Sequence, residues 1–176
     1  MAFSNPEGNI KQLGQIRGLK IADFGSGVGA YTIPLAKGVG DFGRVYAIEI
    51  QKDFLSKIQK VAREENLTNV EVLWGDIERV GATKLSNESV DIVVIANVFF
   101  QIEDKQGVVA EVRRVLSSKG RVLFVEWRDS YGGIGPHPDM VVNPNIARQY
   151  FEDNGFTLDR SIQTGDQHYG FIMTKN

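Results

Sequence analysis

The chain has 176 residues, about the length of one domain. Its 42% hydrophobic and 24% charged residues are the balance of an ordinary globular protein. It contains no cysteine, which excludes disulfides, thiolate zinc sites and cysteine nucleophiles, and its net charge of -2 argues against a domain that relies on contacts to phosphate groups.

Neither a targeting signal nor a membrane span is evident in the sequence. Residues 1–17 contain no apolar core of signal-peptide length. The longest apolar stretch, residues 92–100, is interrupted by Asn97 and is far shorter than the ~20 residues of a membrane-spanning helix. The sequence therefore predicts a cytoplasmic protein.

Short apolar runs alternate with amphipathic segments along the chain. The run at 90–96 is nearly continuous in apolar residues, as in a parallel strand that is covered on both faces. After Gly155, two strand-like runs, 156–164 and 168–175, are joined by Gly165-Asp166, which is typical of a hairpin. Five earlier runs predict strands at residues 19–24, 44–49, 70–74, 90–96 and 121–127.

Amphipathic spacing predicts helices between these strands. Residues 51–66 and 103–118 each place their apolar side chains on one helix face. Gly120 is predicted to end the second of these helices in the left-handed conformation. Asn143-Pro144 predicts the start of another helix, which closes at Asn154-Gly155.

The two helices expected nearest the N-terminus are less regular. A helix over 28–37 contains Pro34, so it either begins late or bends. A short helix around 9–15 is expected to act as a lid.

Strands that alternate with helices predict a parallel sheet with right-handed crossovers. Ligands bind such sheets at the carboxyl ends of the strands, so the loops that follow the strands form the candidate site.

The loop after the first strand is rich in glycine. Its sequence, Asp23-Phe24-Gly25-Ser26-Gly27-Val28-Gly29-Ala30, lets the backbone turn sharply and approach a ligand. The same loop satisfies the dinucleotide-binding pattern G-x-G-x-x-G/A. Asp23 favours a different ligand, because a carboxylate before the first glycine would repel a pyrophosphate and would suit a cation with amino and sulfonium groups.

Carboxylates also follow the second and third strands. Glu49 ends the second strand, where it can accept two hydrogen bonds from a ribose diol; this device serves both dinucleotide and S-adenosyl nucleotide sites. Gly75-Asp76-Ile77 ends the third strand. Its carboxylate can accept from an adenine amino group while the apolar side chain packs on the ring.

Together these motifs resemble the class I S-adenosylmethionine-dependent methyltransferases. The order and spacing match from Leu19 to Gly120, and the final hairpin is similar to the last two strands of that family. The resemblance implies an α/β, Rossmann-like fold with a seven-stranded, mostly parallel sheet, a C-terminal antiparallel hairpin and helices on both faces. The matching motifs are Asp-x-Gly-x-Gly-x-Gly at 23–29, Glu49, Gly-Asp-Ile at 75–77 and Val-Asp-Ile-Val-Val-Ile-Ala-Asn at 90–97.

The resemblance also implies roles for individual residues, with S-adenosylmethionine as the cofactor. The glycine loop and Tyr31 would surround the methionine part, and Glu49 would bind the ribose hydroxyls. Asp76 and Ile77 would hold adenine, and Asn97 would lie beside the methyl group. The cofactor-binding residues implied in this way are Asp23, Gly25, Ser26, Gly27, Gly29, Tyr31, Glu49, Ile50, Asp76, Ile77 and Asn97.

A single domain is expected to contain the whole site. Its parts are an N-terminal helix or lid (1–18), a cofactor-binding core (19–128), a substrate loop (129–143) and a closing helix with the hairpin (144–176). A loop as long as 129–143 is often functional, and it is expected to roof the acceptor.

Two residues of that loop, Asp129 and His137, are the candidate general bases, because the ordinary histidine pKa of ~6.5 suits proton removal near neutral pH. No metal is predicted, since the spacing of His137 to other candidate ligands matches no metal motif. His168 and Tyr169 on the hairpin are interpreted as packing residues.

The acceptor is expected to be a small molecule. Many methyltransferases that act on base amino groups carry an Asn/Asp-Pro-Pro-aromatic motif where this chain has Asn97-Val98-Phe99-Phe100, so a nucleic-acid partner is disfavoured. The absence of cysteine excludes acceptors held by thiols, as in arsenite enzymes. The sequence is compatible with a homo-oligomer.

The sequence thus predicts transfer of a methyl group from S-adenosylmethionine to a small or medium-sized acceptor. One alternative is a catalytically silent partner protein that only binds the cofactor. The other is an NAD(P)-dependent oxidoreductase, which is disfavoured by Asp23, by Gly75-Asp76-Ile77, by the closing hairpin and by the absence of a Tyr-x-x-x-Lys pair.

Overall fold

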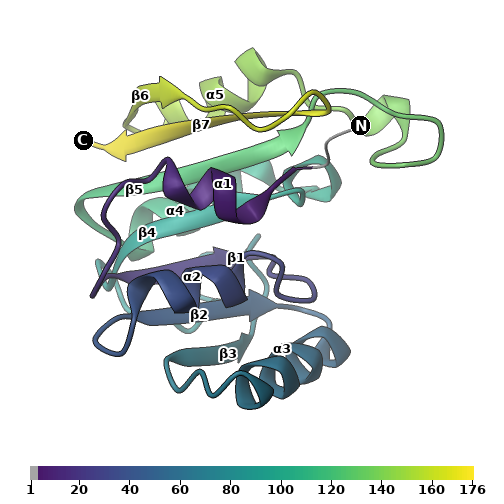
Figure 1. The fold of residues 1–176 in the computed structure, drawn as a ribbon. Helices are drawn as coiled ribbons and strands as arrows, with labels where there is room; N and C mark the ends of the chain where they lie inside the picture. Colours follow the sequence, from purple (N-terminus) through teal and green to yellow (C-terminus); the bar gives the residue numbers. More distant parts are fainter. Residues whose placement is uncertain (1–3) are drawn as a thin grey trace.

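Seven strands form one sheet in the order β3-β2-β1-β4-β5-β7-β6 in a computed structural model that describes residues 4–176 (Figure 1). Strand β7 is antiparallel to both of its neighbours, and every other pairing is parallel. This confirms the predicted fold class. The strands are β1 (Lys20–Phe24), β2 (Arg44–Glu49), β3 (Val70–Trp74), β4 (Val90–Ala96), β5 (Leu116–Trp127), β6 (Phe156–Ser161) and β7 (His168–Lys175).

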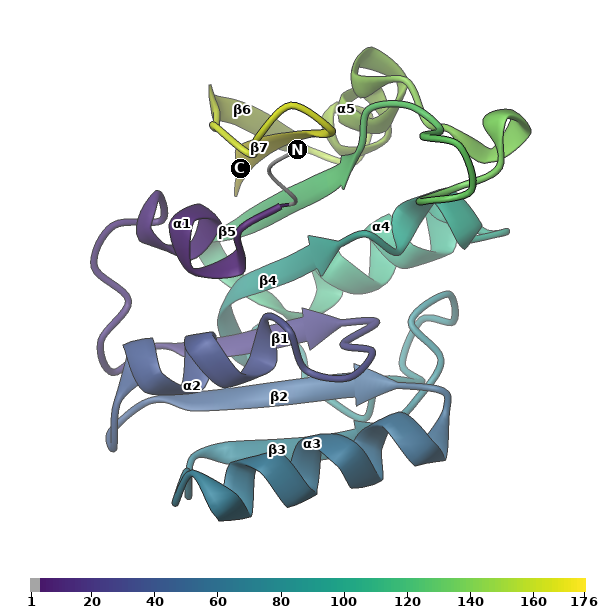
Figure 2. The ribbon, with the colours of Figure 1, turned by 45° about the vertical axis from the view of Figure 1, so that its right-hand side comes forward.

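Helices cover both faces of the sheet (Figures 1 and 2). One face carries α1 (Pro6–Lys11), α2 (Thr32–Val39) and α3 (Lys52–Glu64), and the other carries α4 (Lys105–Val115) and α5 (Pro144–Glu152). Apolar side chains that alternate along the strands therefore form two cores, one on each side of the sheet. Two 3₁₀ helices, η1 (Phe99–Gln101) and η2 (Pro138–Met140), lie in the loops.

Asparagine followed by proline begins two of the helices. The side chains of Asn5 and Asn143 each accept a hydrogen bond from a backbone N–H of the first turn, and the proline that follows needs no donor there. The first helix therefore spans Pro6–Lys11 and not the predicted 9–15. Pro34 is the third residue of α2, so this helix begins late and does not bend.

The prediction for Gly120 was wrong. The residue in the left-handed conformation is Lys119, with φ 60°, and α4 already ends at Val115. Gly120 is required for space instead, because a Cβ there would lie 2.9 Å from both Leu116 Cδ2 and the Ser117 carbonyl oxygen. Strand β5 consequently begins at Leu116, ahead of the predicted residue 121, with an irregularity in its register against β4.

The strand order places a crevice at the carboxyl edge of the sheet. Strands β1, β2 and β3 follow one another toward one edge of the sheet, and β4 then lies on the other side of β1. The loops after β1 and β4 therefore run to opposite sides of the sheet, and ligands bind α/β sheets in the crevice between such loops. Among the described residues, no helix has both the length and the apolar character needed to cross a membrane.

Candidate cofactor and acceptor site

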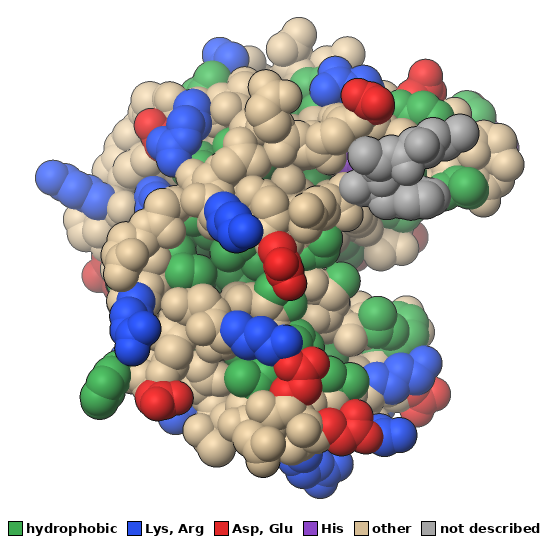
Figure 3. Space-filling model, viewed as in Figure 1, with side chains coloured by type: hydrophobic (Ala, Val, Ile, Leu, Met, Phe, Trp, Pro, Cys, Tyr) green, Lys and Arg blue, Asp and Glu red, His purple; other side chains and the backbone are tan. Residues whose placement is uncertain are grey.

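A cavity of about 470 Å³ lies at the carboxyl ends of β1, β2 and β4. The space-filling view shows a hollow on this edge of the molecule (Figure 3). Four loops line the cavity, at residues 23–31, 48–54, 75–78 and 96–102. The lining includes Asp23, Glu49, Asp76 and Glu78 but no lysine, arginine or histidine among the described residues. It is therefore suited to a cationic ligand.

The glycine loop is held in place by backbone contacts. The N–H groups of Gly25 and Ser26 both donate to the Ile48 carbonyl oxygen, at 2.9 and 3.1 Å. Gly25 has φ 71°, and a Cβ there would lie 2.6 Å from Val98 Cγ2. A side chain at Gly25 would therefore both strain the backbone and push away the loop after β4, which forms the opposite wall.

The carboxylate of Glu49 fixes the same loop to β2. Its Oε2 accepts a hydrogen bond from Gly27 N at 2.9 Å, and its Oε1 accepts from Ile50 N and Gln51 N at 2.9 and 3.0 Å. A carboxylate has about four acceptor positions. Glu49 thus holds the backbone around it and keeps capacity for a hydroxyl donor in the cavity.

Asp23 is a buried carboxylate at the base of the cavity. Its exposed fraction is 2%, and Thr32 Oγ1 donates to its Oδ2 at 2.6 Å. Burial, together with the charge of Glu49, raises the pKa of Asp23 to about 6 against the lowering effect of the Thr32 hydrogen bond. A bound cation would offset both effects.

The third loop is shaped by Gly75 and Trp74. A Cβ on Gly75 would lie 2.6 Å from the Ala82 carbonyl oxygen, so only glycine fits where the loop folds back. Asp76 Oδ1 accepts from Glu78 N at 2.9 Å, which presents the carboxylate at the rim. Trp74 Nε1 donates to the Ile50 carbonyl oxygen at 2.8 Å and links this loop to the end of β2.

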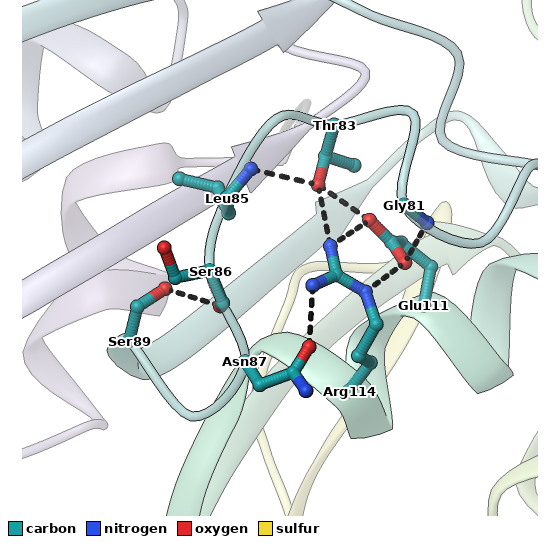
Figure 4. A network of polar contacts seen from close by, with 8 residues as sticks. All are labelled: Gly81, Thr83, Leu85, Ser86, Asn87, Ser89, Glu111 and Arg114. Atoms are coloured by element: carbon teal, nitrogen blue, oxygen red, sulfur yellow. Dashed lines mark hydrogen bonds and ion pairs between the residues drawn. The ribbon is translucent and has the colours of Figure 1, made fainter.

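A buried ion pair clamps the rest of the connection from β3 to β4 onto α4 (Figure 4). Glu111 has no exposed surface, and its carboxylate accepts from Gly81 N, from Thr83 Oγ1 and from two nitrogens of Arg114 at 2.7 and 2.8 Å. Burial raises the pKa of Glu111, but these donors outweigh burial and hold it below its ordinary value. Arg114 also donates to Asn87 Oδ1 at 2.8 Å.

Two polar atoms in the cavity wall have no hydrogen-bond partner among residues 4–176. Asn97 has φ 55°, and its N–H donates to the Val125 carbonyl oxygen. Its side-chain oxygen and the hydroxyl of Ser26 are buried and make no hydrogen bond within the described part of the chain. Unpaired buried polar atoms are rare and are usually satisfied by a ligand, ion or water.

The sequence analysis considered Glu126 only among the candidate metal ligands near His137, whose spacing matches no metal motif, and did not foresee its role as an anchor. This fully buried carboxylate accepts from Phe100 N at 3.1 Å and from Trp127 N at 2.8 Å, and so anchors η1, which supplies Gln101 to the cavity. Burial raises the pKa of Glu126 to about 7, against the lowering effect of these N–H donors. The sequence feature that could have indicated a buried, hydrogen-bonded Glu126 is its position as a single carboxylate within the apolar run 121–127.

The comparisons with known proteins agree with this geometry. A family model described as "Methyltransferase domain" matches residues 16–155. The chain belongs to the class I S-adenosylmethionine-dependent methyltransferases. Their cofactor, S-adenosylmethionine, is also the cofactor of this chain.

The methyltransferase fold extends over the whole sheet. A solved S-adenosylmethionine-dependent methyltransferase from Aquifex aeolicus superposes with a TM-score of 0.88 at 26% identity, covering 98% of this chain and 90% of that one. A demethylmenaquinone methyltransferase from Lactococcus lactis is 28% identical over 82% of this chain and 53% of its own length. The human arsenite methyltransferase is 34% identical over 59% of this chain and 29% of its own length. The chain spans about half the length or less of these two curated relatives.

Ten of the eleven residues predicted to bind the cofactor line the cavity at the carboxyl edge of the sheet. The exception is Gly29, which has φ 92° and faces α3, where a Cβ would lie 3.0 Å from Ile58 Cγ1. The cavity also includes residues that the motifs did not indicate, among them Phe54, Gln101 and Ile102.

The two predicted catalytic residues lie elsewhere. Asp129 and His137 are exposed and do not line the cavity; Asp129 accepts from Ser130 N, and His137 Nδ1 lies 3.3 Å from Asp139 Oδ2. The loop 129–143 likewise contributes no lining residue. Within residues 4–176 no group of three or more histidine or carboxylate side chains is arranged to hold a metal ion.

Proposed function

We propose that this chain transfers the methyl group of S-adenosylmethionine to a small or medium-sized acceptor and releases S-adenosylhomocysteine. The observation that carries the proposal is the charge of the cavity: four carboxylates and no cationic side chain among its described lining residues. S-adenosylmethionine is a cation with a sulfonium and an ammonium group, and such a cavity favours it over an anionic ligand of similar shape.

The positions of the lining residues support specific roles. Glu49 and Asp76 are proposed to accept hydrogen bonds from ribose hydroxyls and from the adenine amino group, with Ile50 and Ile77 against the ring. Asp23 and the glycine loop would neutralise and surround the methionine ammonium. The unpaired oxygens of Ser26 and Asn97 would be satisfied at the methionine end.

The residues act mainly by positioning. When bound, S-adenosylmethionine supplies a methyl group that the sulfonium charge has already activated. What the protein must add is alignment of the acceptor atom behind that methyl group, which is worth several orders of magnitude in rate. The wall formed by Asn97, Val98 and η1, anchored by Glu126, is proposed to provide this alignment.

The acceptor is proposed to be a small molecule that is not bound through thiolates. Curated relatives include demethylmenaquinone and arsenite methyltransferases, but this chain contains no cysteine. The loop after β4 also lacks the prolines typical of enzymes that act on base amino groups. A cytoplasmic location, a homo-oligomer and catalytic roles for Asp129 and His137 stay predictions from the sequence.

Ligand binding separates this proposal from an oxidoreductase. By calorimetry we expect S-adenosylhomocysteine to bind and NADH not to bind, because the pyrophosphate of NADH would face the carboxylates of the cavity. Tight binding of NADH alone would overturn the proposal. Turnover on a panel of phenols, amines and thiols then distinguishes an enzyme from a silent cofactor-binding protein.

Substitution of Glu49 and Asp76 tests the site itself. Glu49→Ala and Asp76→Ala should each weaken binding of S-adenosylhomocysteine by about 1–3 kcal/mol, the scale of hydrogen bonds that involve a charged group. Glu71→Ala is the matched control, because Glu71 is an exposed strand carboxylate outside the cavity. Equal affinity of all three variants and the parent would remove the proposed cofactor site.

A further inference from the structure

Tyr31 connects the cavity to the N-terminal helix. Its side chain is 5% exposed and belongs to the lining of the cavity, where the glycine loop leads into α2. Helix α1 lies on the same face of the sheet as α2, and its Ile10 packs in the same core as Tyr31 (Figures 1 and 2). The phenol is therefore shared between the cavity and the N-terminal segment.

The hydroxyl of Tyr31 accepts a hydrogen bond from a buried amide. Asn9 of α1 is 1% exposed, and its Nδ2 donates to the Tyr31 hydroxyl at 2.8 Å and to Ser4 Oγ at 2.9 Å. An asparagine amide nitrogen carries two hydrogens, so these two bonds use both. The Tyr31 oxygen is thereby fixed as an acceptor toward α1, and its own proton points elsewhere.

The other contact of the Tyr31 hydroxyl leaves this proton available. Ser4 Oγ lies 3.3 Å from the Tyr31 oxygen, and either oxygen can be the donor. This distance is longer than the ~2.5–3.0 Å of an ordinary hydrogen bond between hydroxyl groups. If Ser4 donates, the Tyr31 proton has no partner within residues 4–176. If Tyr31 donates, a ligand can replace this long bond with a shorter one.

The proposed ligand needs a neutral donor in this cavity. S-adenosylmethionine and S-adenosylhomocysteine both carry a carboxylate on the same carbon as the ammonium, but the described lining has four carboxylates and no cation. An anion that is buried there requires hydrogen-bond donors. The backbone N–H groups of residues 25, 26, 27 and 29 in the glycine loop already donate within the protein, so these four are not available to the ligand.

Tyr31 lies near the carboxylate that is proposed to hold the ammonium. Asp23 accepts a hydrogen bond from Thr32, the residue after Tyr31. Burial raises the pKa of the Tyr31 hydroxyl, and the charge of Asp23 adds to this effect, so the hydroxyl stays protonated and can donate. Because the ligand's ammonium and carboxylate share one carbon, a donor beside Asp23 is placed for the carboxylate.

We propose that the Tyr31 hydroxyl donates to the α-carboxylate of the bound cofactor, and that Asn9 is the positioning residue that turns the hydroxyl proton toward it. The inference rests on the function proposed above. Asn9 does not touch the ligand in this arrangement and acts through Tyr31. By this contact α1 becomes part of the cofactor site.

Two ligands that differ only in the carboxylate test the proposal by calorimetry. S-adenosylhomocysteine has the carboxylate, and its decarboxylated form, S-adenosyl-3-thiopropylamine, keeps the ammonium and the nucleoside. Tyr31→Phe should weaken binding of S-adenosylhomocysteine by about tenfold or more, and Asn9→Leu by about threefold or more, since a hydrogen bond to a charged group is lost or misdirected. Affinity for the decarboxylated ligand should stay within about twofold, which also shows that each variant is folded.

A double-mutant cycle separates positioning from structural support of α1. In the Tyr31→Phe background Asn9 has no hydroxyl to orient, so adding Asn9→Leu should cause no further loss of affinity. Gln12→Leu is the matched control. Gln12 also holds the N-terminal segment, through hydrogen bonds with the N–H and the carbonyl oxygen of Gln163, and makes none with Tyr31 among the described residues. Gln12→Leu should bind both ligands like the parent.

Asn9→Asp tests the direction of the hydrogen bond. It keeps the shape of the side chain, but a carboxylate accepts the Tyr31 proton instead of donating, so binding of S-adenosylhomocysteine should weaken at least as much as in Asn9→Leu. Parental affinity of either Asn9 variant overturns the proposal. An equal loss for both ligands, or a similar loss in Gln12→Leu, also overturns it. Failure of the parent to bind S-adenosylhomocysteine would instead refute the proposed function.

Discussion

At the scale of single residues, the most informative group is Asp23, because its protonation is coupled to the charge of the ligand. Burial and the charge of Glu49 raise the pKa of Asp23 to about 6. A cationic ligand binds the ionised form, so affinity should be full well above pH 6 and should fall as the pH drops through 6.

Affinity measured against pH tests this coupling. At pH 5 about a tenth of Asp23 is ionised, so binding of S-adenosylhomocysteine, whose homocysteine part carries an ammonium group, should weaken by up to about tenfold relative to pH 7. The measurement is calorimetry between pH 5 and 8. Asp23→Asn should bind weakly and lose most of this pH dependence; a variant that follows the parent curve would assign the effect to Glu49 or Asp76.

Glu126 predicts a pH dependence of stability. Its folded-state pKa of about 7 lies above the ordinary value of 4.5, so the folded protein binds this proton more tightly than the unfolded chain. The resulting stabilisation is complete below about pH 4.5 and is lost as the pH rises through 7. The charged and titratable groups that influence this region are Lys105 on α4, Tyr169 on β7 and Arg128.

Urea unfolding of Glu126→Gln and the parent measures this effect. Between pH 5 and pH 8, the free energy of unfolding of the parent should fall by on the order of 3 kcal/mol relative to that of Glu126→Gln. The contribution of Asp23 is common to both proteins and cancels. A difference that does not vary with pH would mean that Glu126 stays ionised throughout.

At the scale of secondary-structure elements, the connection from β3 to β4 depends on one clamp. Arg114 is the main partner of the buried Glu111, so Arg114→Ala would leave a carboxylate uncompensated. We expect a loss of about 3 kcal/mol of stability. Affinity for S-adenosylhomocysteine should also fall, because the clamped loop carries Asp76.

An exposed ion pair provides the comparison. Lys60 lies 3.8 Å from Glu64 on the surface of α3, and Lys60→Ala should change the free energy of unfolding by less than about 0.5 kcal/mol. Both variants are measured by urea unfolding and calorimetry. Similar small losses in the two variants would show that the Glu111 clamp is not needed to order the loop.

Elements with a strong local signal were predictable from the sequence. The strands at 44–49, 70–74 and 90–96 have the predicted bounds, and Asn143-Pro144 begins α5 as expected. The same asparagine–proline signal at Asn5 begins α1, although the prediction placed that helix later. A local pattern therefore predicts where an element begins and ends when it includes a helix cap or a continuous apolar run.

Features that depend on distant contacts were not predictable. Gly120 is required by its distance to the side chain of Leu116, and no local rule indicates that Lys119 takes the left-handed conformation. Glu126 anchors η1 across a gap of 26 residues. The glycine loop, Glu49 and Gly75-Asp76-Ile77 were recognisable because each lies at the carboxyl end of a strand.

At the scale of the whole molecule, ligand binding should be visible as thermal stability. A ligand at a hundred times its Kd adds about 2.7 kcal/mol to the free energy of unfolding. For a domain of this size that raises Tm by about 5–11 °C. Differential scanning fluorimetry with S-adenosylhomocysteine measures it, with adenosine at the same concentration as a weaker control. If Tm does not rise at a saturating concentration, the ligand does not bind the folded state in preference to the unfolded state, and the prediction is wrong.

The insertion of β7 between β5 and β6 has a consequence for synthesis on the ribosome. Strand β6 leaves the ribosome before β7, yet β7 is the one strand that pairs with it among the described residues. Until residues 168–175 emerge, β5 has an open edge and β6 has no strand to pair with. The nascent chain can complete β1 to β5 early, but it must protect an apolar strand edge while the rest is translated.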